Sequence, residues 1–168
     1  MKAIKLLFIL ISITGFAQSK VGTVDVDYII SLMPEIPSIQ KQVSDYATGL
    51  DGDFNKNVAA YNVLTTAYAA GEAGFTPEVI KQKQEEILKA EKELNQFQQN
   101  GTKLINIKRD ELLRPLYQKI GVSLEKLSKT ENFTQVLQIT EALVYIDPEF
   151  DLTLKILKDL GIEVKAGQ

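Results

Sequence analysis

The 168-residue chain contains no cysteine, no histidine and no tryptophan. Without cysteine it forms no disulfide, no thiolate zinc site and no thiol nucleophile. Without histidine it has no Ser-His or Cys-His catalytic pair and no imidazole metal ligand. Gly71 and Gly74 are not followed by the Gly-Lys-Ser/Thr of a phosphate-binding loop. We therefore expect a protein that is not an enzyme and that uses no cofactor.

The chain also lacks an excess of positive charge and a long hydrophobic run. Its 19 basic and 22 acidic residues give a formal net charge of −3, which argues against a nucleic-acid partner. No apolar run reaches the roughly 20 residues that a membrane-spanning helix needs. We expect no stable membrane insertion of the mature chain.

The acidic residues match no metal-binding or catalytic pattern. Asp25 and Asp27 would share one face of a strand, and a solvated face or a helix cap explains them better than acid/base chemistry. The run from Asp147 to Asp151 resembles the start of a calcium loop. The later positions that require Gly and Glu hold Leu152 and Lys158, so helix capping is favoured and no metal site is expected.

The first 17 residues have the pattern of a secretory signal peptide. Two lysines precede an apolar run at residues 6–13, and the small residues Gly15 and Ala17 set a cleavage site before Gln18. A membrane anchor is the alternative, but the apolar run is short for that role. Cleavage between Ala17 and Gln18 would leave an exported chain, residues 18–168, with a net charge of −5.

A strand pattern opens the mature chain and a helical pattern follows it. Residues 20–27 alternate, with Val24 and Val26 on one side. Apolar residues then recur at a mean spacing of about 3.6, which predicts a long helix over 38–70. A turn at 71–76 follows, with Thr76 as the N-cap of a second long helix. Two long helices around a tight turn form an antiparallel hairpin.

Three positions weaken these helices. Gly52 and Gly101 each cost a helix about 1 kcal/mol relative to alanine, and Pro115 removes one backbone hydrogen bond. We predict a kink near residues 111–114, which would divide an outer arm from a base. Gly52, Gly101 and Pro115 are the hinge candidates.

Strand patterns return after residue 130, at 133–139 and 142–146. A last helix is expected to open at Asp147-Pro148 with Asp147 as its cap. The apolar side chains expected on one face of this helix are Phe150, Leu154, Leu157 and Leu160. Three strands are about the minimum for a stable sheet, so the base is expected to need partner chains.

In this order, the elements resemble the Skp (OmpH) family of periplasmic chaperones of outer-membrane proteins. The similarity lies mainly in the opening KVGTVDVDYIIS and the closing NFTQVLQITEALVYIDPEFDLTLKILKDLGI, above all the D-L-T-x-x-I-L-K-x-L that begins at Asp151. It implies an α+β, mostly helical fold with one chaperone domain at 18–168. A small β body, residues 18–37 and 115–168, would form with other subunits, and a helical hairpin arm would span 38–114 with its tip at 71–76.

The resemblance also implies a function and its sites. It implies a jellyfish-shaped homotrimer in the periplasm whose arms hold unfolded outer-membrane proteins without ATP. Candidates for contact with these clients are Tyr61, Tyr68 and Phe75. Their helical spacing favours packing between the two helices instead, except for Tyr68 and Phe75, which flank the turn and are the candidates best placed for exposure. Candidates for subunit contact in the body are Val24, Val26, Leu143 and Tyr145.

The charge of the arm departs from the strongly basic enterobacterial member of this family. Residues 38–114 contain ten basic and eleven acidic residues. This composition argues against an electrostatic grip on clients and against a lipopolysaccharide-binding patch. We attribute attraction to apolar contacts and confinement, or to local charge patterns that the net value hides. The alternative function is a structural coiled-coil spacer or adaptor of the cell envelope that binds one defined partner.

Overall fold

The computed structural model describes residues 19–164, so the proposed leader and its cleavage site at Ala17 and Gln18 lie outside the described residues. Two compact units share these residues. One is Glu35–Pro115, which we call the arm. The other, which we call the base, combines the described residues before Glu35 with those after Pro115.

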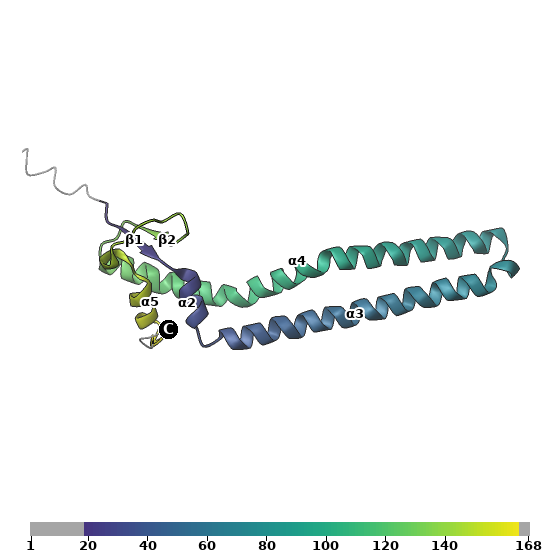
Figure 1. Ribbon diagram of the computed structural model, residues 1–168, viewed down its shortest axis with the longest axis horizontal. Coiled ribbons are helices and arrows are strands. Elements are labelled where there is room, and N and C mark those ends of the chain that lie inside the picture. The colour runs from purple at the N-terminus through teal and green to yellow at the C-terminus, as the bar shows by residue number, and fades with distance from the viewer. Residues whose placement is uncertain (1–18, 165–168) are drawn as a thin grey trace, which may run out of the picture. The chain divides into compact units, whose positions relative to one another are not determined.

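The arm is the predicted helical hairpin. Helix α3 (Ile36–Gly71) and the first part of helix α4 (Pro77–Thr130) run antiparallel, joined by the 3-10 turn η2 (Glu72–Gly74) (Figure 1). The Thr76 hydroxyl accepts a hydrogen bond from the Val79 N–H at 3.4 Å, the predicted N-cap of the second helix. Both helices are continuous through the predicted weak points Gly52, Gly101 and Pro115.

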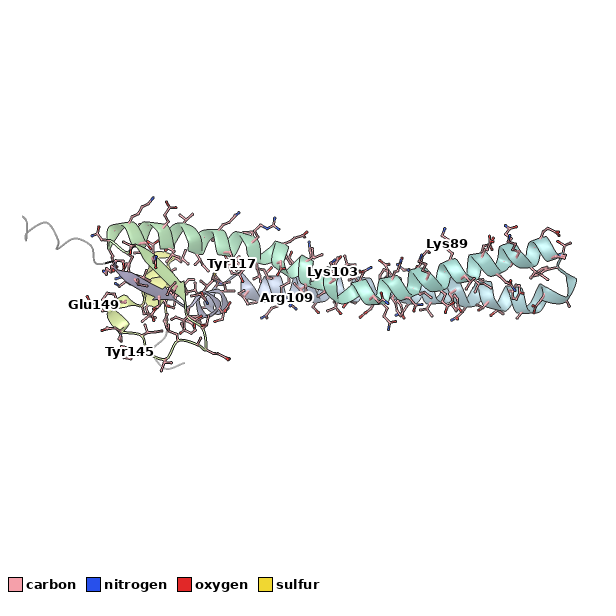
Figure 2. All side chains as sticks on the ribbon, turned by 90° about the horizontal axis from the view of Figure 1, so that it is seen from above. Lys89, Lys103, Arg109, Tyr117, Tyr145 and Glu149 are labelled. Atoms are coloured by element: carbon pink, nitrogen blue, oxygen red, sulfur yellow. The ribbon has the colours of Figure 1, made fainter. Side chains whose placement is uncertain are left out.

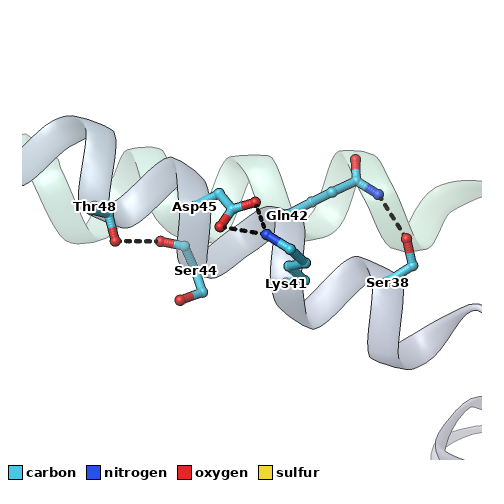
Figure 3. Close-up of polar contacts among 6 residues, drawn as sticks. All are labelled: Ser38, Lys41, Gln42, Ser44, Asp45 and Thr48. Carbon is cyan, nitrogen blue, oxygen red and sulfur yellow. Dashed lines mark hydrogen bonds and ion pairs between the residues drawn. The ribbon is translucent and has the colours of Figure 1, made fainter.

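One stripe of α3 packs against α4, as its spacing predicts. The apolar residues at this spacing are buried or half-buried from Ile39 to Tyr68, and the Phe54 and Phe97 rings stack across the seam with centroids 6.1 Å apart. The outer face of α3 carries short polar contacts, of which Lys41–Asp45 and Gln42–Ser38 are examples (Figure 3). Such exposed contacts add only a few tenths of a kcal/mol each, so the seam holds the hairpin together.

The base is built on a parallel strand pair. Strand β1 (Val21–Val24) pairs with β2 (Gln135–Gln138), with Val21 opposite Gln135. The strands are parallel because α4 returns the chain past β1, and the turn at Asn132 (φ 60°) then sends β2 back in the direction of β1. On the other side of β1, Thr23 forms an isolated parallel β-bridge with Asp151.

Two short helices complete the core of the base. They are α2 (Val26–Leu32) and α5 (Thr153–Asp159), which follows the 3-10 turn η3 (Pro148–Phe150). Apolar side chains from these helices and from α4 meet in a small core. The large side chains that are fully buried are Ile29, Leu152, Ile156 and Leu157.

Four details of the sequence-based prediction are wrong. Residues 142–146 form no strand: the sheet of the described residues consists of β1 and β2 alone. The first strand ends at Val24, so Asp25 and Asp27 share no strand face: Asp25 caps α2 and Asp27 lies in its first turn.

The other two corrections concern the end of the chain. Asp147 does act as a cap, but of η3, and the helix itself begins six residues later at Thr153. This shift rotates the buried face. Leu157 is buried as expected, whereas Leu154 is 62% exposed and Ile156 takes its place in the core.

Candidate functional site

A group of hydrogen bonds in the base joins the residue after β1 to the start of α5. The backbone N–H of Asp25 donates to Thr153 Oγ1 at 2.9 Å, and the Thr153 hydroxyl donates to Asp151 Oδ1 at 2.6 Å. Thr153 is only 4% exposed, so each of these groups would be costly to leave unpaired. The Asp-Leu-Thr of the closing motif therefore has a structural role in this chain.

A second polar cluster ties α5 to α4. Asp159 accepts hydrogen bonds from Ser123 Oγ at 2.8 Å and from Lys126 Nζ. The hydrogen bond from Lys126, and to a smaller extent that from Ser123, holds the pKa of Asp159 below its usual value. Lys155 also pairs with Glu131 at 2.7 Å. The last helix is thus fixed to α4 by both apolar packing and ion pairs.

Despite this core, the base leaves many large apolar side chains exposed. Of the twelve large hydrophobic side chains that are exposed among the described residues, nine belong to the base and three to the arm. The nine are Val21, Tyr117, Val122, Leu137, Leu143, Val144, Tyr145, Leu154 and Val164. So many exposed apolar side chains on a small unit are typical of a protein interaction surface.

The four predicted subunit-contact residues fall in different surroundings. Leu143 and Tyr145 are exposed, at 36% and 77%, and Tyr145 lies at the outside of the base (Figure 2). Val26 is half-buried, and Val24, at 3% exposure, belongs to the core of the chain itself.

The uncovered surface includes an unpaired sheet edge. Within the described chain β2 pairs with β1 only, so its second edge carries backbone donors and acceptors without a strand partner. Leu137 on β2 is 52% exposed, and Val144, in the nearby β-forming segment 142–146, is 97% exposed. Sequence reasoning singled out neither residue, although the run of β-forming residues at 142–146 was a signal for them.

At the arm tip, the predicted client-contact residues Tyr68 and Phe75 lie together. Their ring centroids are 6.3 Å apart, and Phe75 also covers Gly71, where an added Cβ would lie 2.3 Å from the ring. The Tyr68 hydroxyl donates to Glu72 at 2.8 Å, which raises the pKa of Tyr68, and accepts from Gln84 at 3.0 Å. Tyr61 lies two turns earlier on α3, and all three aromatic side chains are half-buried.

Charge is distributed unevenly over the two helices of the arm. Residues 57–71 of α3 carry no charged side chain, whereas residues 81–93 of α4 carry eight. Those on α4 have mixed sign and include the pairs Lys83–Glu86 and Lys89–Glu93. Lys89 extends from α4 into solvent (Figure 2). The arm therefore offers an uncharged outer stretch on one helix and a neutralised charged stretch on the other.

The described residues contain neither a membrane-spanning helix nor a cluster of metal ligands. Within residues 19–164 no helix combines the length and the hydrophobicity needed to cross a bilayer. In the same residues no three carboxylates come together in a way that could hold a metal ion.

Comparisons with known proteins agree with this fold. The search of curated proteins finds no match. Among solved structures, the crystal structure of an OmpH-like outer membrane chaperone from Caulobacter crescentus has a TM-score of 0.60 at 13% sequence identity, over 92% of this chain and 90% of that one. The family described as outer membrane protein (OmpH-like) matches residues 20–160. The chain therefore belongs to the OmpH-like family.

Proposed function

We propose that this protein is an ATP-independent periplasmic holdase chaperone that sequesters unfolded outer-membrane proteins between its helical arms. The observation that carries the proposal is the arm itself: a long hairpin without a metal cluster among its described residues, in a chain of the OmpH-like family. The similarity to an OmpH-like outer membrane chaperone from Caulobacter crescentus supports the same role. A signal peptide cleaved between Ala17 and Gln18 would place the protein in the periplasm.

The holding unit in this proposal is a homotrimer assembled through the base. The nine exposed apolar side chains there would lose contact with water, at a gain of about 25 cal/mol for each Å² buried. The open edge of β2 could accept segment 142–146 of another copy as an added strand, which would cover Leu143 and Tyr145. Val24 and Val26 would support that surface from within, since Val24 is part of the core.

Clients would be held by weak and dispersed contacts along the arms. Tyr61, Tyr68 and Phe75 each leave part of a ring accessible, and aromatic rings offer contact area with little directional demand. Because the arm is nearly neutral, its attraction for clients should change little with salt. Weak contacts also permit release without ATP.

Adjustment of the arms to client size is a further part of the proposal. Gly52, Gly101 and Pro115 would permit bending, since Pro115 provides no N–H for a helical hydrogen bond. Spin labels at two positions on one arm test this point. We expect several distances or a broad distribution, and a single narrow distribution would count against flexible arms.

Light scattering of a diluted, denatured outer-membrane protein tests the holdase function. With a stoichiometric amount of this protein, and with no nucleotide present, we expect aggregation to be suppressed. The alternative function, a coiled-coil spacer that binds one defined partner, predicts no suppression across several unrelated outer-membrane proteins. An unrelated coiled coil of equal length is the control for non-specific effects.

A further inference from the structure

The arm has two open hollows, each formed by both helices. The outer hollow, near the tip, has a volume of about 420 Å³. It is lined by Thr65, Tyr68, Gln84, Ile87 and Leu88. The inner hollow has a volume of about 300 Å³. It is lined by Leu50, Asp51, Phe54, Phe97, Gln98, Gly101, Thr102 and Ile105.

The two hollows are related by a displacement of fourteen residues along both helices. Fourteen residues separate Tyr68 from Phe54 on α3, and Gln84 from Gln98 and Leu88 from Thr102 on α4. Fourteen residues are nearly four turns of a helix with 3.6 residues per turn, so positions this far apart point within roughly 40° of the same direction. The hollows therefore open on one side of the arm, with an aromatic ring of α3 in each.

Their separation matches the geometry of an extended peptide. Fourteen helical residues at 1.5 Å each place the hollows roughly 21 Å apart. An extended chain rises about 3.3–3.4 Å per residue, so about six residues cover that distance. Six is an even number, and side chains six residues apart on a strand point to the same face.

The lining suits uncharged side chains. The outer hollow has no charged residue in its lining, and Asp51 is the one such residue in the inner lining. The uncharged stretch 57–71 of α3 follows the α3 lining of the inner hollow and includes that of the outer hollow. A row of apolar side chains could therefore bind here with little desolvation of charge.

Gly101 lies in the lining of the inner hollow. A Cβ added there would meet nothing within 4 Å, so close packing does not require a glycine at this helical position. The corresponding residue of the outer hollow, fourteen positions earlier, is Ile87.

We propose that the two hollows are sockets for one extended strand of an unfolded client, which places apolar side chains i and i+6 in the inner and outer hollow. The transmembrane strands of a β-barrel have this chemistry, with 9–11 residues and an apolar side chain at every second position. This inference rests on the proposed function, and it assigns client contact to one side of the arm.

A matched pair of glycine substitutions tests the sockets. Gly101→Met fills the inner hollow, whereas Gly52→Met adds the same side chain to another helical glycine with open space, outside either lining. Both changes favour helix, and circular dichroism should confirm that both variants fold. The probe is a fluorescent ten-residue peptide that alternates leucine with serine, compared with a peptide that carries the same leucines in one block.

We expect the unmodified protein to prefer the alternating peptide, measured by fluorescence anisotropy. Gly101→Met should weaken binding of the alternating peptide roughly tenfold, which is the effect expected when one apolar side chain loses its buried position. Gly52→Met should weaken it less than twofold. Equal effects of the two substitutions would indicate stiffening of the arm and would overturn the sockets. Equal affinity for the two peptides, or no binding of either, would overturn them as well.

The same samples distinguish a failure of the holdase function from a failure of the sockets alone. If the unmodified protein fails to suppress aggregation of a denatured outer-membrane protein, the holdase function itself is wrong. If it suppresses aggregation while the peptide and glycine comparisons fail, the function stands and only the sockets are wrong.

Discussion

The backbone N–H of Asp25 donates to Thr153 Oγ1 at 2.9 Å, although the two residues lie 128 positions apart in the sequence. Asp25 caps α2 in turn, since its side chain accepts a hydrogen bond from the Tyr28 N–H. One hydroxyl at the start of α5 therefore fixes both the end of β1 and the beginning of α2. This contact joins the first and last elements of the base.

Substitution of Thr153 should destabilise the base. Thr153→Val keeps the shape of the side chain but leaves the Asp25 N–H without its acceptor and Asp151 without the hydroxyl donor. We expect a loss of about 1–3 kcal/mol in the free energy of unfolding, measured by urea denaturation at fixed protein concentration. Thr153→Ser retains the hydroxyl and should lose less than half as much. Equal losses for the two variants would show that the hydroxyl has no special role.

Gly22 on β1 should not tolerate a larger residue. A Cβ there would lie 2.8 Å from the Phe133 ring and 3.2 Å from the Phe150 carbonyl oxygen. We expect Gly22→Ala to lower the thermal midpoint, at a cost of about 1–3 kcal/mol. Gly49→Ala is the control, because a Cβ on that helical glycine meets nothing within 4 Å and should be neutral or stabilising.

Acid should weaken the attachment of α5 to α4. The folded chain holds the pKa of Asp159 below its usual value, so this carboxylate stabilises the fold above its unfolded pKa of about 3.9. The contribution is lost as the pH falls through the lower, folded pKa. We expect Asp159→Asn to reduce stability at pH 7 and to make the decline between pH 5 and pH 2 shallower, measured by denaturant midpoints. Asp45→Asn, in an exposed pair within α3, should change this profile little.

Charge at the exposed base segment should disrupt assembly. Val144 is 97% exposed in the single chain, so Val144→Asp should leave its folding intact while placing a carboxylate in the proposed subunit contact. Light scattering coupled to chromatography should then show monomers in place of trimers. Val63→Asp, a change at a 67% exposed position on the arm, is the control and should retain the mass of the trimer. Identical masses for the two variants would place the subunit contact elsewhere.

The elements that sequence reasoning predicted well depend on local patterns. The spacing from Ile39 to Tyr68 identified α3, and Thr76 before Pro77 identified the start of α4. Segment 142–146 was predicted as a strand because its residues favour β structure. A strand also needs a partner strand, and this segment pairs with none among the described residues. That dependence on a partner cannot be read from propensity.

The features that sequence reasoning missed depend on contacts between distant residues. The role of Thr153 requires the approach of β1 to α5, and the burial of Ile156 in place of Leu154 depends on where α5 begins. The two hollows depend on the register between α3 and α4. Their one signal in the sequence was the repeat at fourteen residues, with an aromatic residue on one helix and a glutamine on the other.

Native mass spectrometry of this protein mixed with a denatured eight-stranded outer-membrane protein tests the central claim most directly. The account predicts a complex that contains three copies of this chain and one client, formed without nucleotide. A chain that stays monomeric, or a trimer that leaves the client unbound, would contradict it.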